Sequence, residues 1–254
     1  MNIYDQYDAR IACIMSKIED LRGRKKRFGQ GIFEPVWEPP LTEEEAAAFE
    51  AEKGIRLPDD YRRFITAYAS AGKQPFGELY PLRQTESVVE KSFPYTLNSI
   101  LYFLYMTEEE MDYFWDEDTP FTANQGLLTL CHEGDGMYSV LVVNSEDADT
   151  YGTVWYYDLA NDFGIVPMYD RETEKPFHFL DWLEYWVDRT MSLDQDGYFG
   201  YVETVRLPEP PDRPDIMGRK MGWIEYIKGN TVSERIETSL CALFLCKGIK
   251  YDRN

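Results

Sequence analysis

The pattern of hydrophobic and polar positions predicts helices in the first part of the chain. Apolar side chains recur at steps of three and four over residues 4–21, which places them on one stripe of an amphipathic helix that ends before Gly23. A second helix begins after Thr42, because Thr42 and Glu45 have the spacing of a capping box, in which each side chain bonds the other residue's backbone amide. Gly54 is placed to end this helix.

The pattern then changes from helical stripes to strands. A third helix is predicted from Pro58 to near Gly72. After it, β-branched and aromatic runs alternate with turn residues, which is typical of an antiparallel sheet. The predicted strands cover residues 127–131, 137–144, 153–158 and 164–168, with a tight hairpin at 133–136 and an acidic loop at 145–151. An apolar face over residues 179–191 predicts a closing helix.

A proline-dense stretch, residues 207–214, divides the chain. It predicts a stiff, extended linker, and a capping box at residues 231–234 predicts a helix beyond it. We therefore expect an N-terminal helix (residues 1–27), an α+β domain with a mostly antiparallel sheet flanked by helices (residues 28–198), and a Pro-rich linker with a C-terminal helical extension (residues 199–254).

The chain is strongly acidic, and the acid is concentrated in one part of it. Of 254 residues, 46 are acidic and 26 basic, which gives a net charge of −20. Residues 1–83 carry −1, residues 84–198 carry −20 and residues 199–254 carry +1. Such a field repels nucleic acid and anionic membranes and attracts basic partners, so we expect neither nucleic-acid nor membrane binding. Solubility is the alternative explanation for an acidic composition.

The composition favours a folded cytoplasmic protein. Hydrophobic residues make up 44% of the chain and aromatic residues 15%, enough for a core that needs no disulfide or metal ion. No apolar run approaches the roughly 18 to 20 residues that cross a bilayer, and the polar, acidic start differs from a secretory signal. The four cysteines lack paired spacing, so we expect them to be reduced.

Candidates for catalysis and metal binding are few. Cys131 beside His132 is the best candidate for a nucleophile with its base, but neighbours on a strand point to opposite faces. Asp147, Asp149 and Asp158 fit part of a calcium-loop spacing, but strands are predicted where the flanking helices should be. We therefore expect no enzymatic activity, no cofactor and no metal ion.

Acidic residues of the middle segment are the candidates for partner binding. Residues 108–118 combine large aromatic side chains with carboxylates, a composition suited to a basic protein surface. The apolar members of this segment also fit the buried side of a short helix. The hairpin and the loop beside the predicted sheet add further carboxylates. The predicted partner-binding residues are Asp116, Glu117, Asp118, Glu133, Asp135, Asp147 and Asp149.

Residues 41–64 resemble the signature of the SUKH superfamily, a capped helix that ends in Gly54, followed by Leu-Pro before a Tyr-containing helix. Four later segments resemble, in order, the family's Gly-Leu-x-Pro-Leu turn, central strand, following strand and closing helix. These are residues 76–82, 136–144, 152–155 and 179–186. One departure is that residues 69–73 replace the Asn-Gly-Gly of many members.

The resemblance, over about residues 28–191, implies a SUKH-like α+β domain without catalytic residues. It also implies a role in protein binding, since bacterial members act as immunity proteins that neutralise toxins, often nucleases, and fungal members regulate cell-wall synthesis. We therefore predict an immunity protein that covers the basic active-site surface of a toxin domain. A regulatory scaffold that binds a host protein or peptide is the alternative.

Overall fold

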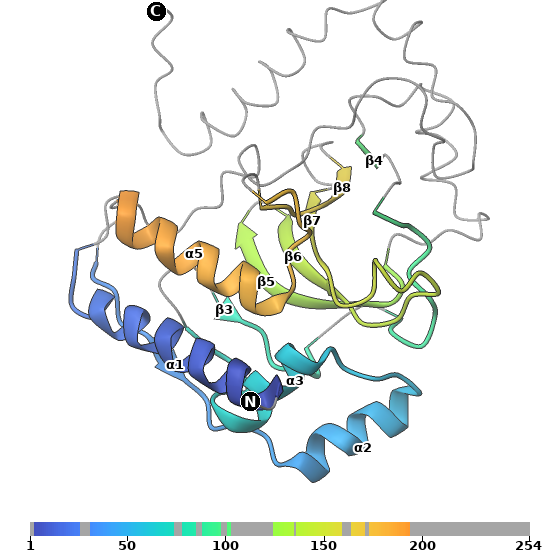
Figure 1. The fold of residues 1–254 in the computed structure, drawn as a ribbon, viewed down its shortest axis with the longest axis horizontal. Helices are drawn as coiled ribbons and strands as arrows, with labels where there is room; N and C mark the ends of the chain where they lie inside the picture. The colour runs from blue at the N-terminus through green and yellow to red at the C-terminus, as the bar shows by residue number, and fades with distance from the viewer. Residues whose placement is uncertain are drawn as a thin grey trace, which may run out of the picture.

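A computed structural model of the chain describes residues 3–25, 31–73, 78–84, 88–97, 101–102, 124–134, 136–158, 164–170 and 173–193. Helices and one antiparallel sheet make up this part of the chain, so the predicted α+β class is confirmed (Figure 1). The described helices are α1 (Ile3–Leu21), α2 (Glu43–Lys53), α3 (Asp59–Ala67) and α5 (Phe179–Leu193). None of them has the length and hydropathy of a membrane span.

The sheet joins eight described strands in the order β1-β2-β3-β5-β6-β7-β8-β4, and each strand is antiparallel to its neighbours. The strands are β1 (Val36–Trp37), β2 (Gly72–Lys73), β3 (Glu78–Leu79), β4 (Leu101–Tyr102), β5 (Leu127–Gly134), β6 (Met137–Val142), β7 (Val154–Asp158) and β8 (Gly164–Pro167). β5 to β8 correspond to the four predicted strands. β1 to β4 were not predicted, because two residues are too few to show an alternating pattern.

The two ends of α2 are fixed by capping interactions, and the helix has only a small buried face. The Thr42 hydroxyl accepts from the Glu45 amide (3.1 Å), and the Glu45 carboxylate accepts from the Thr42 amide (2.8 Å). Gly54 follows the helix in the left-handed conformation, with φ 65°. Only Ala46 and Phe49 are buried along α2. The predicted capping box and terminal glycine are therefore confirmed, and they stabilise a helix that has little apolar surface to bury.

The prediction for the end of α3 was wrong. The helix ends at Ala67 and not near Gly72, which lies in β2 and pairs with Trp37 of β1. The Ser70 hydroxyl donates to the Pro39 carbonyl (2.6 Å), which holds the chain after α3 against the segment before α2. These tertiary bonds outweigh the helical tendency of the intervening alanines.

The sheet is buried on both faces. Side chains alternate along the strands, so that Leu141 and Tyr156 face one core cluster while Val140 and Trp155 face another. The first cluster includes buried residues of α1, α3 and α5, which lie on one side of the sheet (Figure 1). On the opposite face, Phe93 of the segment before β4 packs against Trp155.

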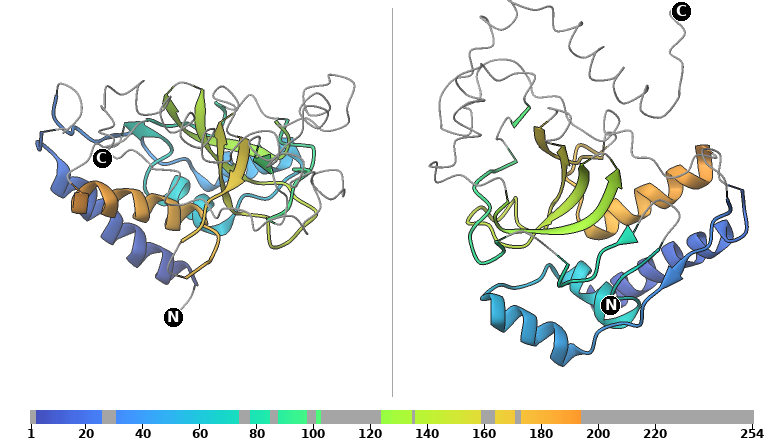
Figure 2. Two further views of the ribbon diagram at one scale, coloured as in Figure 1. Left: turned by 90° about the horizontal axis from the view of Figure 1, so that it is seen from above. Right: turned by 180° about the vertical axis from the view of Figure 1, so that it is seen from behind.

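Helix α1 belongs to this core. Ile11, Ile14 and Ile18 are fully buried in the same cluster as the apolar face of α5. The two helices contact each other along their length and lie side by side in Figure 2. The predicted domain boundaries at residues 27/28 and 198/199 lie outside the described residues, and the C-terminal helical extension (199–254) does too, so this division remains a prediction.

Replacing Ile14 by Ala should lower the free energy of unfolding by about 3 kcal/mol, because the change removes buried methyl groups and leaves a cavity beneath α5. Urea denaturation of the full chain, followed by circular dichroism, measures the loss. Ser16→Ala is the control, since Ser16 is exposed on the same helix and its replacement should cost less than about 0.5 kcal/mol. Equal effects of the two changes would contradict the packing of α1 into the core.

Candidate functional site

The predicted partner-binding residues that the structure describes lie at two ends of the sheet. Asp147 and Asp149 lie in the loop between β6 and β7, whereas Glu133 lies in β5 next to the hairpin that leads to β6. The six residues of β6 separate the two ends by roughly 17 Å. Asp116, Glu117, Asp118, Asp135 and the side chain of Glu133 lie outside the described residues. The role of this set in binding therefore remains a prediction.

Within the loop, Asp147 and Asp149 differ in what their carboxylates do. The Asp147 carboxylate accepts from the backbone amide of Thr150 (3.1 Å) and from the Thr150 hydroxyl, and the Asp147 amide donates to the Ser145 hydroxyl (3.1 Å). Asp149 is exposed. Asp147 therefore shapes the turn, which accounts for its place in the calcium-like spacing, while Asp149 presents its carboxylate to solvent.

Cys131 and His132 point to opposite faces of the sheet, as predicted. The Cys131 side chain is fully buried in the cluster beneath the helices. His132 is exposed on the other face, where its ring stacks on that of Tyr138 with 4.7 Å between the ring centroids. This geometry does not let the imidazole act as a base for the thiol. The described residues also include no cluster of His, Cys, Asp or Glu side chains suited to a metal ion.

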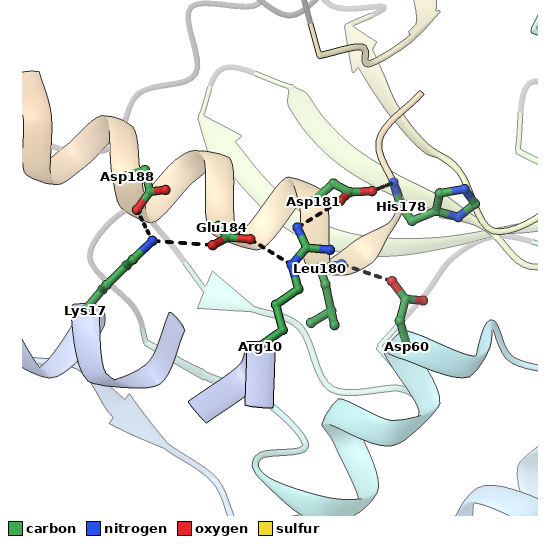
Figure 3. A network of polar contacts seen from close by, with 8 residues as sticks. All are labelled: Arg10, Lys17, Asp60, His178, Leu180, Asp181, Glu184 and Asp188. Atoms are coloured by element: carbon green, nitrogen blue, oxygen red, sulfur yellow. Dashed lines mark hydrogen bonds and ion pairs between the residues drawn. The ribbon is translucent and has the colours of Figure 1, made fainter. Parts of the chain in front are cut away.

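A buried carboxylate joins α3 to the N-terminus of α5. Asp60 is 7% exposed, and one of its carboxylate oxygens accepts from the amide of Leu180 (3.0 Å) (Figure 3). The other oxygen accepts from the amide of Tyr61 (2.8 Å). The Asp181 carboxylate accepts from the amide of His178 (3.0 Å) at the same helix end. Helix α5 is thus capped by a residue 120 positions earlier in the chain. Burial raises the pKa of Asp60, although His178 and the two amides oppose this shift.

An ion-pair ladder joins α1 to the solvent side of α5. Arg10 contacts Asp181 (2.8 Å) and Glu184 (2.7 Å), and Lys17 contacts Glu184 (3.4 Å) and Asp188 (2.6 Å) (Figure 3). The residue numbers rise together along both helices, so the helices run parallel. These side chains are about a quarter to a half exposed, so each pair contributes at most about 1 kcal/mol. The ion pairs therefore fix the alignment of α1 with α5 and contribute little to the stability of the fold.

A groove runs beside this ladder. It consists of two adjoining cavities of about 570 and 440 Å³, which share Arg10, His178 and Asp181. The larger lies along α5 against residues 173–178; the smaller lies among the first turns of α1, α3 and α5 and the end of the β6–β7 loop. The acidic residues that line the two cavities together are Asp59, Asp60, Asp170, Asp181, Glu184 and Asp188, and the basic ones are Arg10, Arg56 and Lys175. This excess of acid suits the binding of positively charged side chains.

The groove was missed by sequence reasoning. The bond between Asp60 and Leu180 and the pairing of Arg10 with Asp181 each join residues that lie far apart in the sequence. No local spacing indicates either contact. The apolar stripe of α1 is the sequence pattern that bears on the groove. It could have indicated the groove only if the packing of α1 against α5 were already known.

Asp60→Asn should remove a pH dependence of stability. Burial raises the folded-state pKa of Asp60 above the unfolded value of about 3.9, so the folded chain binds this proton more tightly. The contribution of this tighter proton binding to the free energy of unfolding is complete below about pH 4, and it is lost as the pH rises through the folded-state pKa of Asp60. The unfolding free energy of the wild type minus that of Asp60→Asn should therefore fall from pH 4 upwards, as measured by urea denaturation at several pH values.

Asp20→Asn is the control for this measurement, because it removes the same charge from an exposed position on α1. A difference between the wild type and Asp60→Asn that grows with pH would contradict the raised pKa.

Comparison with known proteins places this fold in a family. Residues 40–188 match the SMI1 / KNR4 family (SUKH-1). This match covers more than half of the chain and includes α2, α3, β2 to β8 and most of α5, while α1 and β1 precede it. The curated proteins and the solved structures include no match to the chain. The extent of the family match and the order of the elements within it show that the chain belongs to the SMI1 / KNR4 family (SUKH-1), as the sequence resemblance predicted.

Proposed function

We propose that this chain is a non-catalytic immunity protein that neutralises a cognate toxin by covering the toxin's basic active-site surface. Membership of a family that is generally non-enzymatic and includes immunity proteins supports the proposal. The observation that carries it for this chain is the net charge of −20 on residues 84–198, within a chain that is otherwise almost neutral. A nuclease is the proposed class of toxin, because nucleases hold a polyanion on a basic surface.

Exposed carboxylates in the described part of the acidic segment support the proposal. Glu146 and Asp149 are exposed in the loop between β6 and β7. Tyr151 at the end of this loop donates its hydroxyl proton to the Arg56 carbonyl (2.8 Å), which ties the loop to the link between α2 and α3. The carboxylates therefore project from an anchored loop beside the groove. Fixed charge of one sign raises the rate of encounter with a surface of the opposite sign.

Neutralisation by occlusion needs no chemistry from this chain. An interface of ordinary size buries about 800 Å² on each partner. Tyr151 at the end of the acidic loop also lines the groove, so one interface can include parts of both. A nuclease covered in this way cannot reach its substrate. We also propose that the protein acts in the cytoplasm, where a nuclease toxin would meet nucleic acid.

Coexpression with the product of the adjacent open reading frame tests the proposal. If that product is toxic, this chain should restore growth, and the two proteins should copurify. A toxic product that is not neutralised contradicts the immunity role. A harmless neighbour that copurifies with the chain favours the alternative, a regulatory scaffold.

Asp149→Lys should slow association with the neutralised toxin about three- to tenfold at low salt, because it reverses an exposed charge on the proposed contact surface. Stopped-flow or surface-based kinetics measure the rate constant. Asp20→Lys makes the same charge change on an exposed part of α1, outside the acidic segment, and should change the rate less than about twofold. Equal effects of the two variants would contradict the proposed location of the contact.

A further inference from the structure

We propose, on the basis of the immunity function above, that the groove between α1, α3 and α5 receives a segment of the partner that carries Lys or Arg side chains. We further propose that α1 determines which segments fit. The proposal extends the partner surface from the acidic loop to a concave site, and it names residues that select the partner.

The charge of the groove favours a cationic occupant. Its acidic lining residues outnumber its basic ones by six to three among the described residues, or by five to three without the buried Asp60. Carboxylates are accessible at both ends, since the Asp59 side chain is 40% exposed and that of Asp188 is 49% exposed. Each already has one cationic partner in the chain, Arg56 and Lys17 respectively. A carboxylate accepts several hydrogen bonds, so a partner's cation can bind beside the existing one.

Aromatic rings provide the second element of recognition. Tyr7, Tyr151 and Tyr185 line the two cavities, and each is partly exposed. Ring faces attract guanidinium and ammonium groups, and they also pack against the methylene groups that carry them. The Tyr151 ring is held in place by its hydrogen bond to the Arg56 carbonyl. Together, rings and carboxylates suit Lys and Arg better than they suit apolar or acidic side chains.

The α1 wall of the groove lies outside the residues that match the family. The match begins at residue 40, whereas Tyr7 and Arg10 come from α1. Arg10 holds the carboxylates of Asp181 and Glu184 in place on α5, beside the groove. The residues that α3, α5 and segment 170–178 contribute to the groove therefore belong to the matched domain, while Tyr7 and Arg10 are contributed by a helix that precedes the match. Changes in α1 can alter the width and charge of the groove without altering the family fold.

A peptide titration tests the groove independently of any toxin. The ¹⁵N-labelled full chain is titrated with an acetylated hexa-arginine peptide, with acetylated hexaglutamate as the control. The largest chemical-shift changes should occur at the amides of Tyr7, Asp59, Tyr151 and His178. The double change Asp59→Lys with Asp188→Lys should weaken binding at least about tenfold, whereas Asp20→Lys with Glu44→Lys, an equal charge change on exposed residues outside the groove, should weaken it less than about threefold.

Shift changes spread evenly over exposed carboxylates, or equal effects of the two double variants, would overturn the groove site. The role of α1 is tested with the toxin that the chain neutralises. Tyr7→Ala should weaken toxin binding at least fivefold, with the unfolding midpoint recorded to confirm folding, and Tyr7→Phe should retain it. Toxin neutralisation that Tyr7→Ala and the groove variants leave unchanged would overturn the inference while preserving the proposed function. Peptide binding in the groove without any toxin neutralisation would overturn the proposed function while preserving the groove as a site for cationic segments.

Discussion

The position of α5 is the constraint on which the rest of the structure depends. Its aromatic side chains Trp182 and Trp186 are buried between the sheet and the other helices, and the Trp182 ring nitrogen donates to the Ser139 hydroxyl on β6 (3.1 Å). Burial of each such side chain stabilises the fold by several kcal/mol. Asp60 of α3 caps the first turn of α5, so the helix is held at its end as well as along its face. α1 then packs alongside α5, and the groove lies beside the ion pairs that join the two helices.

Local sequence patterns predicted the elements whose stabilising contacts are local. The capping box of α2, the stripe of α1 and the alternation of β5 to β8 all depend on residues a few positions apart. The end of α3 could not be predicted, because Gly72 lies in β2 and pairs with Trp37 of β1, a strand that is distant in the sequence. The groove was missed for the same reason, since the bond from Asp60 to Leu180 spans 120 residues. Of the predicted acidic site, Asp149 is exposed and the Asp147 carboxylate bonds to Thr150, and the role of both residues in binding remains a prediction.

The arrangement of polar groups among the described residues supports the proposed binding role. The histidine beside Cys131 points away from it, and the carboxylates of the groove are engaged with cations and backbone amides. What remains accessible is an excess of negative charge on anchored elements, next to tyrosine rings. This combination gives a partner both long-range attraction and short-range anchors. Family membership and charge distribution thus support the same proposal, a protein that recognises a basic surface.

The dependence of the association rate on salt tests this account most directly. The full chain is used to capture its partner from a native lysate, and the association rate constant of the two purified proteins is measured from 20 to 500 mM NaCl. If the acidic segment steers a basic partner, the rate constant should fall by at least about tenfold over this range, because salt screens charges beyond a few ångströms. A rate constant that stays within about twofold would contradict recognition by charge.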